Sequence, residues 1–91
     1  MKNEAHNKET EMSKAMETAT QIIDGLTGYA RNEARAWEKA DTCRIYFGRK
    51  YITITQDGAV DYDTSDSPYG VLELVRDEMD VTVVNAPSYW A

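Results

Sequence analysis

The side chains of this chain that could do chemistry are mainly carboxylates, and they gather between residues 57 and 80. This stretch holds eight Asp or Glu residues against one cation, Arg76, and eight minus one gives a formal charge of −7. On a predicted helix in this stretch, Glu73, Asp77 and Asp80 stand at i, i+4 and i+7, a spacing that predicts one acidic ridge. Carboxylates on a rigid scaffold offer Lys and Arg side chains oxygen acceptors of the kind that phosphates offer. We therefore predict a surface for a basic partner, made of Asp57, Asp61, Asp63, Asp66, Glu73, Asp77 and Asp80.

Catalysis by a nucleophile with a histidine base is not expected. His6 is the only imidazole, and it lies in a polar stretch without the packed surroundings that would orient a general base. Cys43 is the only cysteine and begins a predicted strand on its inward side, where we expect a small buried side chain. No glycine-rich phosphate loop precedes a Lys-Ser or Lys-Thr pair. We predict that the chain is not an enzyme and that it binds no cofactor.

One loop imitates part of a calcium site. Asp61, Asp63 and Ser65 match the first three ligands of an EF-hand loop. The sixth position of such a loop should be Gly and is Asp66, and the twelfth should be Glu and is Leu72. We therefore predict no metal site, and a calcium-binding module or small carboxylate enzyme that uses this loop remains an alternative to test.

The N-terminal part of the chain changes character near residue 12. Residues 1–11 are polar throughout and are interpreted as an extension, so we predict a single domain over residues 12–91. From Met12 onward, apolar residues recur at helical spacing through Met16 and Ile23. This stripe extends beyond what a small sheet covers, and a homodimer that pairs through these three residues is an alternative expectation.

The helical spacing is interrupted by two glycines. Gly25 and Gly28 would each cost about 1 kcal/mol relative to Ala inside a helix, so we predict two helices, over residues 8–24 and 28–40. One bent helix is the alternative. Trp37 lies on the apolar stripe of the second predicted helix, and we expect it in the core.

Beyond residue 41 the apolar period changes from helical to alternating, which predicts strands. Asp57-Gly58 supplies the residues of a tight hairpin turn. Ser67 and Pro68 suit the start of a helix as its cap and first residue. The predicted fold class is α+β, with helices on one face of a small antiparallel sheet, in the order α-α-β-β-β-α-β. The predicted strands are residues 43–47, 51–56, 59–62 and 81–84.

Charge and composition narrow the expected partners and compartment. The chain has 91 residues and a formal charge of −6. A net anion is repelled by nucleic acid, so we expect no direct nucleic-acid binding. No apolar run approaches the roughly 18 to 20 residues of a membrane span, and a single cysteine favours the cytoplasm. Tyr89 and Trp90 are expected to fold back onto the sheet, with an exposed binding anchor as the alternative.

In architecture and charge, residues 12–84 resemble the small acidic proteins that phages and mobile elements use against host defence, including anti-CRISPR proteins and anti-restriction DNA mimics. The acidic run from Asp57 to Asp66, the predicted ridge and the helix-plus-sheet layout carry the resemblance. It implies a non-enzymatic inhibitor, in the host cytoplasm, that occupies the basic nucleic-acid-binding surface of a host defence complex.

Two alternatives remain beside this interpretation. Arg44, Arg49 and Lys50 form a basic patch on the first predicted hairpin, which departs from a pure DNA mimic and leaves room for a mixed-charge interface. A solvated acidic surface with no partner would produce the same pattern of carboxylates. From a different class, the chain would be a homo-oligomeric structural or regulatory protein that acts through its N-terminal helical seam, Met12, Met16 and Ile23.

Overall fold

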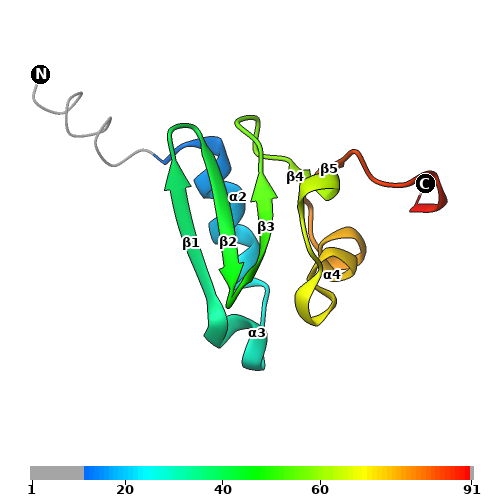
Figure 1. Cartoon of the computed structure of the whole chain (residues 1–91), viewed down its shortest axis with the longest axis horizontal. Helices are drawn as coiled ribbons and strands as arrows, with labels where there is room; N and C mark the ends of the chain where they lie inside the picture. The colour runs from blue at the N-terminus through cyan, green and yellow to red at the C-terminus, as the bar shows by residue number, and fades with distance from the viewer. Residues whose placement is uncertain (1–11, 91) are drawn as a thin grey trace, which may run out of the picture.

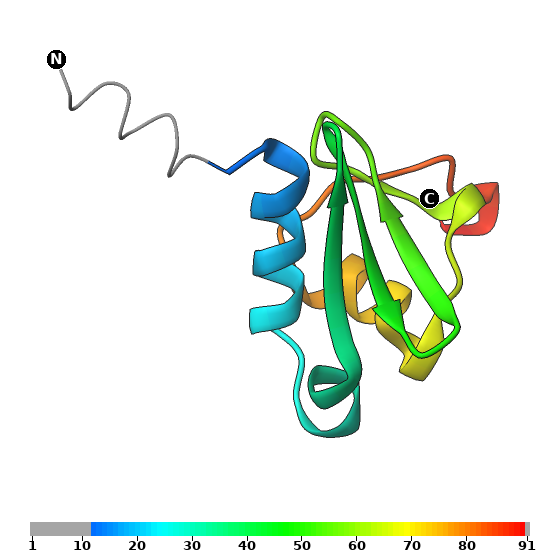
Figure 2. The same ribbon diagram turned by 60° about the vertical axis from the view of Figure 1, so that its left-hand side comes forward.

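The computed structural model describes residues 12–90, so the predicted extension over residues 1–11 lies outside the described residues. The fold class is α+β, as predicted: a five-stranded sheet in the order β1-β2-β3-β4-β5 has helices on one of its faces (Figures 1 and 2). The elements are α2 (Lys14–Asp24), α3 (Gly28–Glu33), β1 (Ala34–Lys39), β2 (Thr42–Phe47), β3 (Lys50–Ile54), β4 (Val60–Asp61), α4 (Val71–Glu78) and β5 (Val83–Val84). Short 3-10 turns cover Tyr62–Thr64, Pro68–Gly70 and Ser88–Trp90.

Helix α2 begins and ends where local chemistry favours it. The Ser13 side chain accepts a hydrogen bond from the backbone N–H of Met16 at 3.1 Å and so satisfies one of the unpaired amides of the first turn. Ala15, Ala19 and Ile22 are fully buried against the sheet. The helix ends at Gly25, and the next one begins at Gly28, so the predicted break between two helices is confirmed.

The second helix is much shorter than predicted, because residues 34–39 form strand β1 instead of continuing to residue 40. In this stretch small apolar residues alternate with long polar or aromatic ones, and the inward pair Ala34 and Ala36 lies opposite Phe47 and Ile45 of β2. A strand here gives the edge of β2 a partner for its backbone groups, which a helix would have left unpaired. The prediction that Trp37 lies in the core was therefore wrong: its side chain is 66% exposed on the opposite face of the sheet.

The remaining strands follow the predicted meander, with one change at its end. The Asp57-Gly58 turn is confirmed; Gly58 has φ of +87°, and its carbonyl accepts a hydrogen bond from Thr18 Oγ1 of α2 at 2.7 Å. Strand β5 is confined to Val83–Val84 and pairs in parallel with β4, because the chain crosses over through α4 between them. The sheet is thus antiparallel except at this edge.

Helix α4 covers the same face of the sheet as α2. The Ser67 side chain accepts a hydrogen bond from the backbone N–H of Leu72 at 3.1 Å, as a capping residue does. The helix begins at Val71 and not at the predicted Pro68, because Tyr69 and Gly70 have positive φ and Pro68–Gly70 form a separate 3-10 turn. Val71, Leu72 and Val75 join the α2 residues in one core. The other face of β1, β2 and β3 carries no helix from the described part of the chain (Figures 1 and 2). Between residues 12 and 90, no helix is both long enough and apolar enough to cross a membrane.

Candidate partner-binding surfaces

The predicted partner-binding carboxylates are accessible but do not all lie together. Six of the seven are exposed and Asp61 is half-buried. Asp57 lies on the turn after β3, whereas the residues that lead into α4 lie beside Gly48 and Lys50, at the turn before β3. Asp57 is thus at the opposite end of β3 from the start of α4 (Figure 1). The structure separates it from the other predicted site residues.

The predicted acidic ridge is shorter than expected. Helix α4 ends at Glu78, and Met79 already has an extended backbone with φ of −117° and ψ of 148°. Asp80 therefore lies beyond the helix, where its carbonyl accepts a hydrogen bond from Gln21 Nε2 of α2 at 3.3 Å. A stripe at i, i+4 and i+7 needs one continuous helix, so only Glu73 and Asp77 share the α4 surface.

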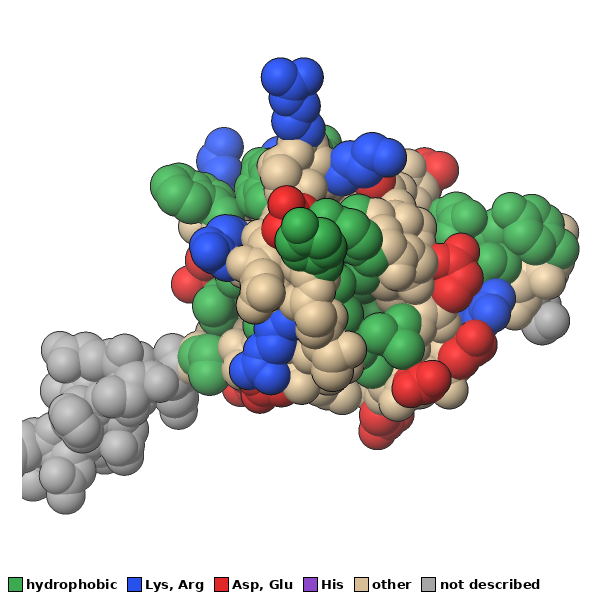
Figure 3. Space-filling model, turned by 90° about the horizontal axis from the view of Figure 1, so that it is seen from below, with side chains coloured by type: hydrophobic (Ala, Val, Ile, Leu, Met, Phe, Trp, Pro, Cys, Tyr) green, Lys and Arg blue, Asp and Glu red, His purple; other side chains and the backbone are tan. Residues whose placement is uncertain are grey.

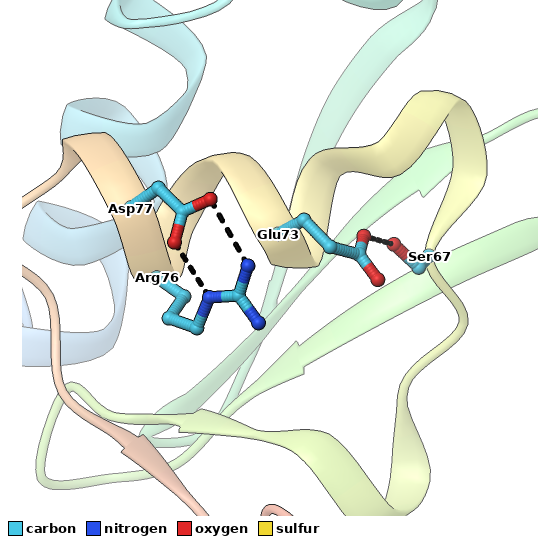
Figure 4. A network of polar contacts seen from close by, with 4 residues as sticks. All are labelled: Ser67, Glu73, Arg76 and Asp77. Carbon is cyan, nitrogen blue, oxygen red and sulfur yellow. Dashed lines mark hydrogen bonds and ion pairs between the residues drawn. The ribbon is translucent and has the colours of Figure 1, made fainter. Parts of the chain in front are cut away.

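The carboxylate of Asp77 forms an ion pair with Arg76 of the same chain. Arg76 Nε and Nη2 donate to its two oxygens at 2.6 and 3.0 Å (Figure 4). This hydrogen bonding to Arg76 lowers the pKa of Asp77. The Arg76 guanidinium also lies 4.7 Å from the centre of the Trp90 ring. Asp77 thus contributes less net charge to a partner than the sequence implies.

Glu73 is held in place by the loop that precedes α4. Ser67 Oγ donates to Glu73 Oε1 at 2.7 Å (Figure 4). The same hydroxyl accepts from the helix backbone, so the loop, the helix start and this carboxylate form one arrangement. Glu73 is exposed, and the group that holds it is a neutral hydroxyl and not a cation.

Asp61 joins two segments rather than pointing freely into solvent. Its Oδ1 accepts from Asn85 Nδ2 at 3.0 Å and from the backbone N–H of Asp63 at 3.2 Å. The hydrogen bond from Asn85 is the main cause of a lowered pKa for Asp61. Asp66 Oδ2 similarly faces the backbone N–H of Tyr51 at 3.4 Å.

The structure nevertheless brings part of the predicted site to one side of the molecule. Trp90 packs edge-to-face on Tyr62 at 4.9 Å between ring centres and lies beneath Arg76, which places the loop after β4 beside α4. In Figure 3, most red carboxylate side chains lie at the right and lower margins, and most blue cationic ones lie at the upper and left margins. We call the exposed residues of the predicted site that lie on this loop and on α4 the acidic surface: Asp63, Asp66, Glu73 and Asp77.

A second surface, on the uncovered face of the sheet, was missed by sequence reasoning. Strand pairing places Trp37 of β1 opposite Arg44 of β2. The Arg44 guanidinium lies 4.3 Å from the centre of the Tyr51 ring, and its Nη1 donates to Tyr46 Oη at 3.1 Å. The alternation of residues 34–39 was the signal that could have revealed this face. We call it the open sheet face; its residues are Arg35, Trp37, Lys39, Arg44, Tyr46 and Tyr51.

The remaining residues considered for catalysis or metal binding are Cys43, His6 and the EF-hand-like loop. Cys43 is buried, and burial is the main cause of its raised pKa. His6 lies outside the described residues. Within residues 12–90 no three His, Cys, Asp or Glu side chains form an arrangement that could hold a metal ion, and this includes the EF-hand-like loop.

The C-terminal aromatic pair and the apolar seam divide between core and surface. Trp90 folds back onto the domain, whereas Tyr89 is 79% exposed. Met16 and Ile23 pack against the core, and Met12 is about half exposed. The core of the same chain thus partly buries two of the three residues predicted to pair with a second copy.

Comparison with known proteins found no match: no family model matches this chain, and no curated protein or solved structure is detectably similar to it.

Proposed function

We propose that this protein is a non-enzymatic binding module that uses its acidic surface to occupy the basic, nucleic-acid-binding surface of a partner protein. The proposed context is inhibition of a host defence complex in the bacterial cytoplasm, in the manner of anti-CRISPR proteins. The observation that carries the proposal is the gathering of exposed carboxylates on α4 and the loop before it, with only Arg76 among them as a cation.

Fixed geometry supports this role. Glu73 is held by Ser67, and the loop is held to β3 by Asp66, whose backbone N–H donates to the Tyr51 carbonyl at 2.9 Å. A surface whose carboxylates are already ordered loses less entropy when it binds, and opposite charge speeds the encounter. Both effects favour recognition of Lys and Arg clusters that ordinarily hold phosphates.

Charge reversal tests the proposal. In a triple variant with Asp63→Lys, Asp66→Lys and Glu73→Lys, we expect capture of a nucleic-acid-handling protein from host extract at low salt to fall at least tenfold. The matched control changes Glu17, Asp24 and Asp57 to Lys; these three carboxylates are exposed but lie outside the acidic surface. The net charge changes equally in both variants, so only a specific surface separates them. Equal capture by the two variants, with both shown to be folded by circular dichroism, would eliminate the acidic surface as the contact.

A further inference from the structure

The open sheet face has a local charge opposite to that of the whole chain. On β1 and β2, residues that point to this face include Arg35, Lys39 and Arg44. The one carboxylate of these two strands, Glu38, belongs to the other face, where Oγ of Ser13, the residue before α2, donates to it at 2.6 Å. Because of this alternation, the described β1 and β2 carry three cations and no carboxylate on the open sheet face.

Aromatic rings lie among these cations. Trp37 has two thirds of its side chain exposed, which is unusual for a ring of its size in the middle of a strand. Tyr46 of β2 lines the same hollow as Trp37, and Tyr51 lies one strand further away on β3, with the Tyr46 and Tyr51 ring centres 5.3 Å apart. A hollow of about 230 Å³ opens beside the Trp37 ring, with Lys39 and Arg44 in its wall.

The order of side chains along β1 suits an extended polyanion. Arg35 and Lys39 flank Trp37 at two residues on either side, which is about 7 Å along a strand. A chain that runs along β1 therefore meets a cation, a flat ring and a second cation in turn. The first of these, Arg35, also donates from Nη1 to the carbonyls of Asn32 and Ala34 at 2.8 Å, so it would meet a phosphate with its other amino groups. Single-stranded nucleic acid offers the matching series of phosphates and unpaired bases, and bases stack readily on aromatic side chains.

The net charge of −6 does not forbid such binding at this face. The carboxylates of α4 belong to the helix layer, on the other side of the sheet (Figure 2). At physiological salt the Debye length is about 8 Å, so charges across the molecule are largely screened. Asp61 and Asp66 lie nearer, along the β3 edge, and they bias an anionic ligand toward β1 and β2.

We propose that the open sheet face binds single-stranded nucleic acid, with Trp37 as the stacking platform and Arg35, Lys39 and Arg44 as phosphate contacts. This inference replaces the expectation from net charge that the chain does not bind nucleic acid directly. It is independent of the proposed function, because the acidic surface does not take part in it. An acidic protein is the competing class of ligand, since Trp, Tyr and Arg are also common at protein interfaces.

Fluorescence anisotropy with a labelled oligodeoxythymidine tests the proposal. A probe of about twelve nucleotides lies within the roughly 4 to 16 nucleotides that a small single-strand-binding domain covers. We expect binding at about 50 mM salt, with an affinity that falls as salt rises at a log–log slope of about −2, from three contacts at about 0.7 each. Under the same conditions we expect a duplex of the same length to bind several-fold less tightly, because its bases are not available for stacking.

Two variants and two matched controls locate the contact. Trp37→Ala and Arg44→Glu should each weaken oligonucleotide binding about tenfold. Tyr89→Ala removes an exposed aromatic ring outside this face, and Lys14→Glu makes the same charge change on α2 as Arg44→Glu makes on the sheet, so both should bind as the parent does. Unchanged melting temperatures would show that the losses are not due to unfolding.

Several results would overturn the inference. Absence of binding at low salt would do so, as would equal binding by Trp37→Ala. Preference for polyglutamate over the oligonucleotide, lost in Arg44→Glu, would assign the face to an acidic protein instead. The acidic-surface triple variant should still bind the oligonucleotide, so failure of the proposed function and failure of this inference are distinguishable.

Discussion

The carboxylates between residues 57 and 80 differ in their hydrogen-bond partners, although in the sequence they form one acidic group. Asp61 connects the end of β4 to Asn85 and to the turn after it. Asp77 is neutralised by its neighbour Arg76, and Glu73 is oriented by Ser67. Hydrogen-bond partners therefore decide which carboxylates remain available to a partner molecule.

We expect Asp61 to make the free energy of unfolding depend on pH in the acidic range. Its pKa is lower in the folded protein than its ordinary value of 3.8, so its stabilising contribution is present above that pH and is lost as the pH falls further. We expect the free energy of unfolding of the parent to exceed that of Asp61→Asn near neutral pH and to converge with it as the pH falls below 3.8. Urea unfolding across this range measures the difference. Asp57→Asn, which removes the same charge from an exposed turn, is the control for the change in net charge.

Among the secondary-structure elements, strand β1 has the largest effect on which side chains are exposed. It gives β2 a partner along six residues and ends the second helix after a turn and a half. Because side chains alternate along a strand, its formation puts Ala34 and Ala36 inside and sends Trp37 to the other face. One change of secondary structure thus creates the open sheet face.

Substitutions in neighbouring strands test this placement. Trp37→Ala should lower the free energy of unfolding by less than about 1 kcal/mol, the usual size of a cross-strand contact on an exposed face. Ile45→Ala should lower it by about 2 to 5 kcal/mol, because Ile45 is fully buried in the adjacent strand. Urea unfolding followed by circular dichroism measures both. A cost at Trp37 as large as that at Ile45 would contradict the strand and restore a buried tryptophan.

At the scale of the whole molecule, two helices on one face of the sheet leave two surfaces of opposite charge. The carboxylates gather around α4, while cations and aromatic rings occupy the open sheet face. We expect this separation to let the two faces bind different molecules, because screening limits each field to about a Debye length.

The same arrangement bears on self-association. Met16 and Ile23 pack against the core of their own chain, which leaves Met12 as the exposed member of the seam. We therefore expect sedimentation equilibrium to give a monomer mass of 10.3 kDa at micromolar concentration, and the same mass for Met12→Asp. A dimer that Met12→Asp dissociates would instead support the homo-oligomeric alternative.

The sequence by itself determined the α+β class, the helix break between Gly25 and Gly28, the Asp57-Gly58 turn and the capping role of Ser67 ahead of α4. These features depend on local chemistry: glycine conformation, side-chain capping and the period of apolar residues. It also located the excess of negative charge, since that needs only a count of residues.

Only the tertiary structure decided the rest. Whether residues 34–39 become helix or strand depends on the unpaired edge of β2, which lies outside that segment. The separation of Asp57 from α4, the pairing of Asp77 and the exposure of Trp37 likewise depend on which segments meet in space. The spacing of apolar residues shows which face of a single helix or strand is buried. A binding site depends on how several helices and strands lie relative to one another, and contacts between segments distant in the sequence determine that arrangement.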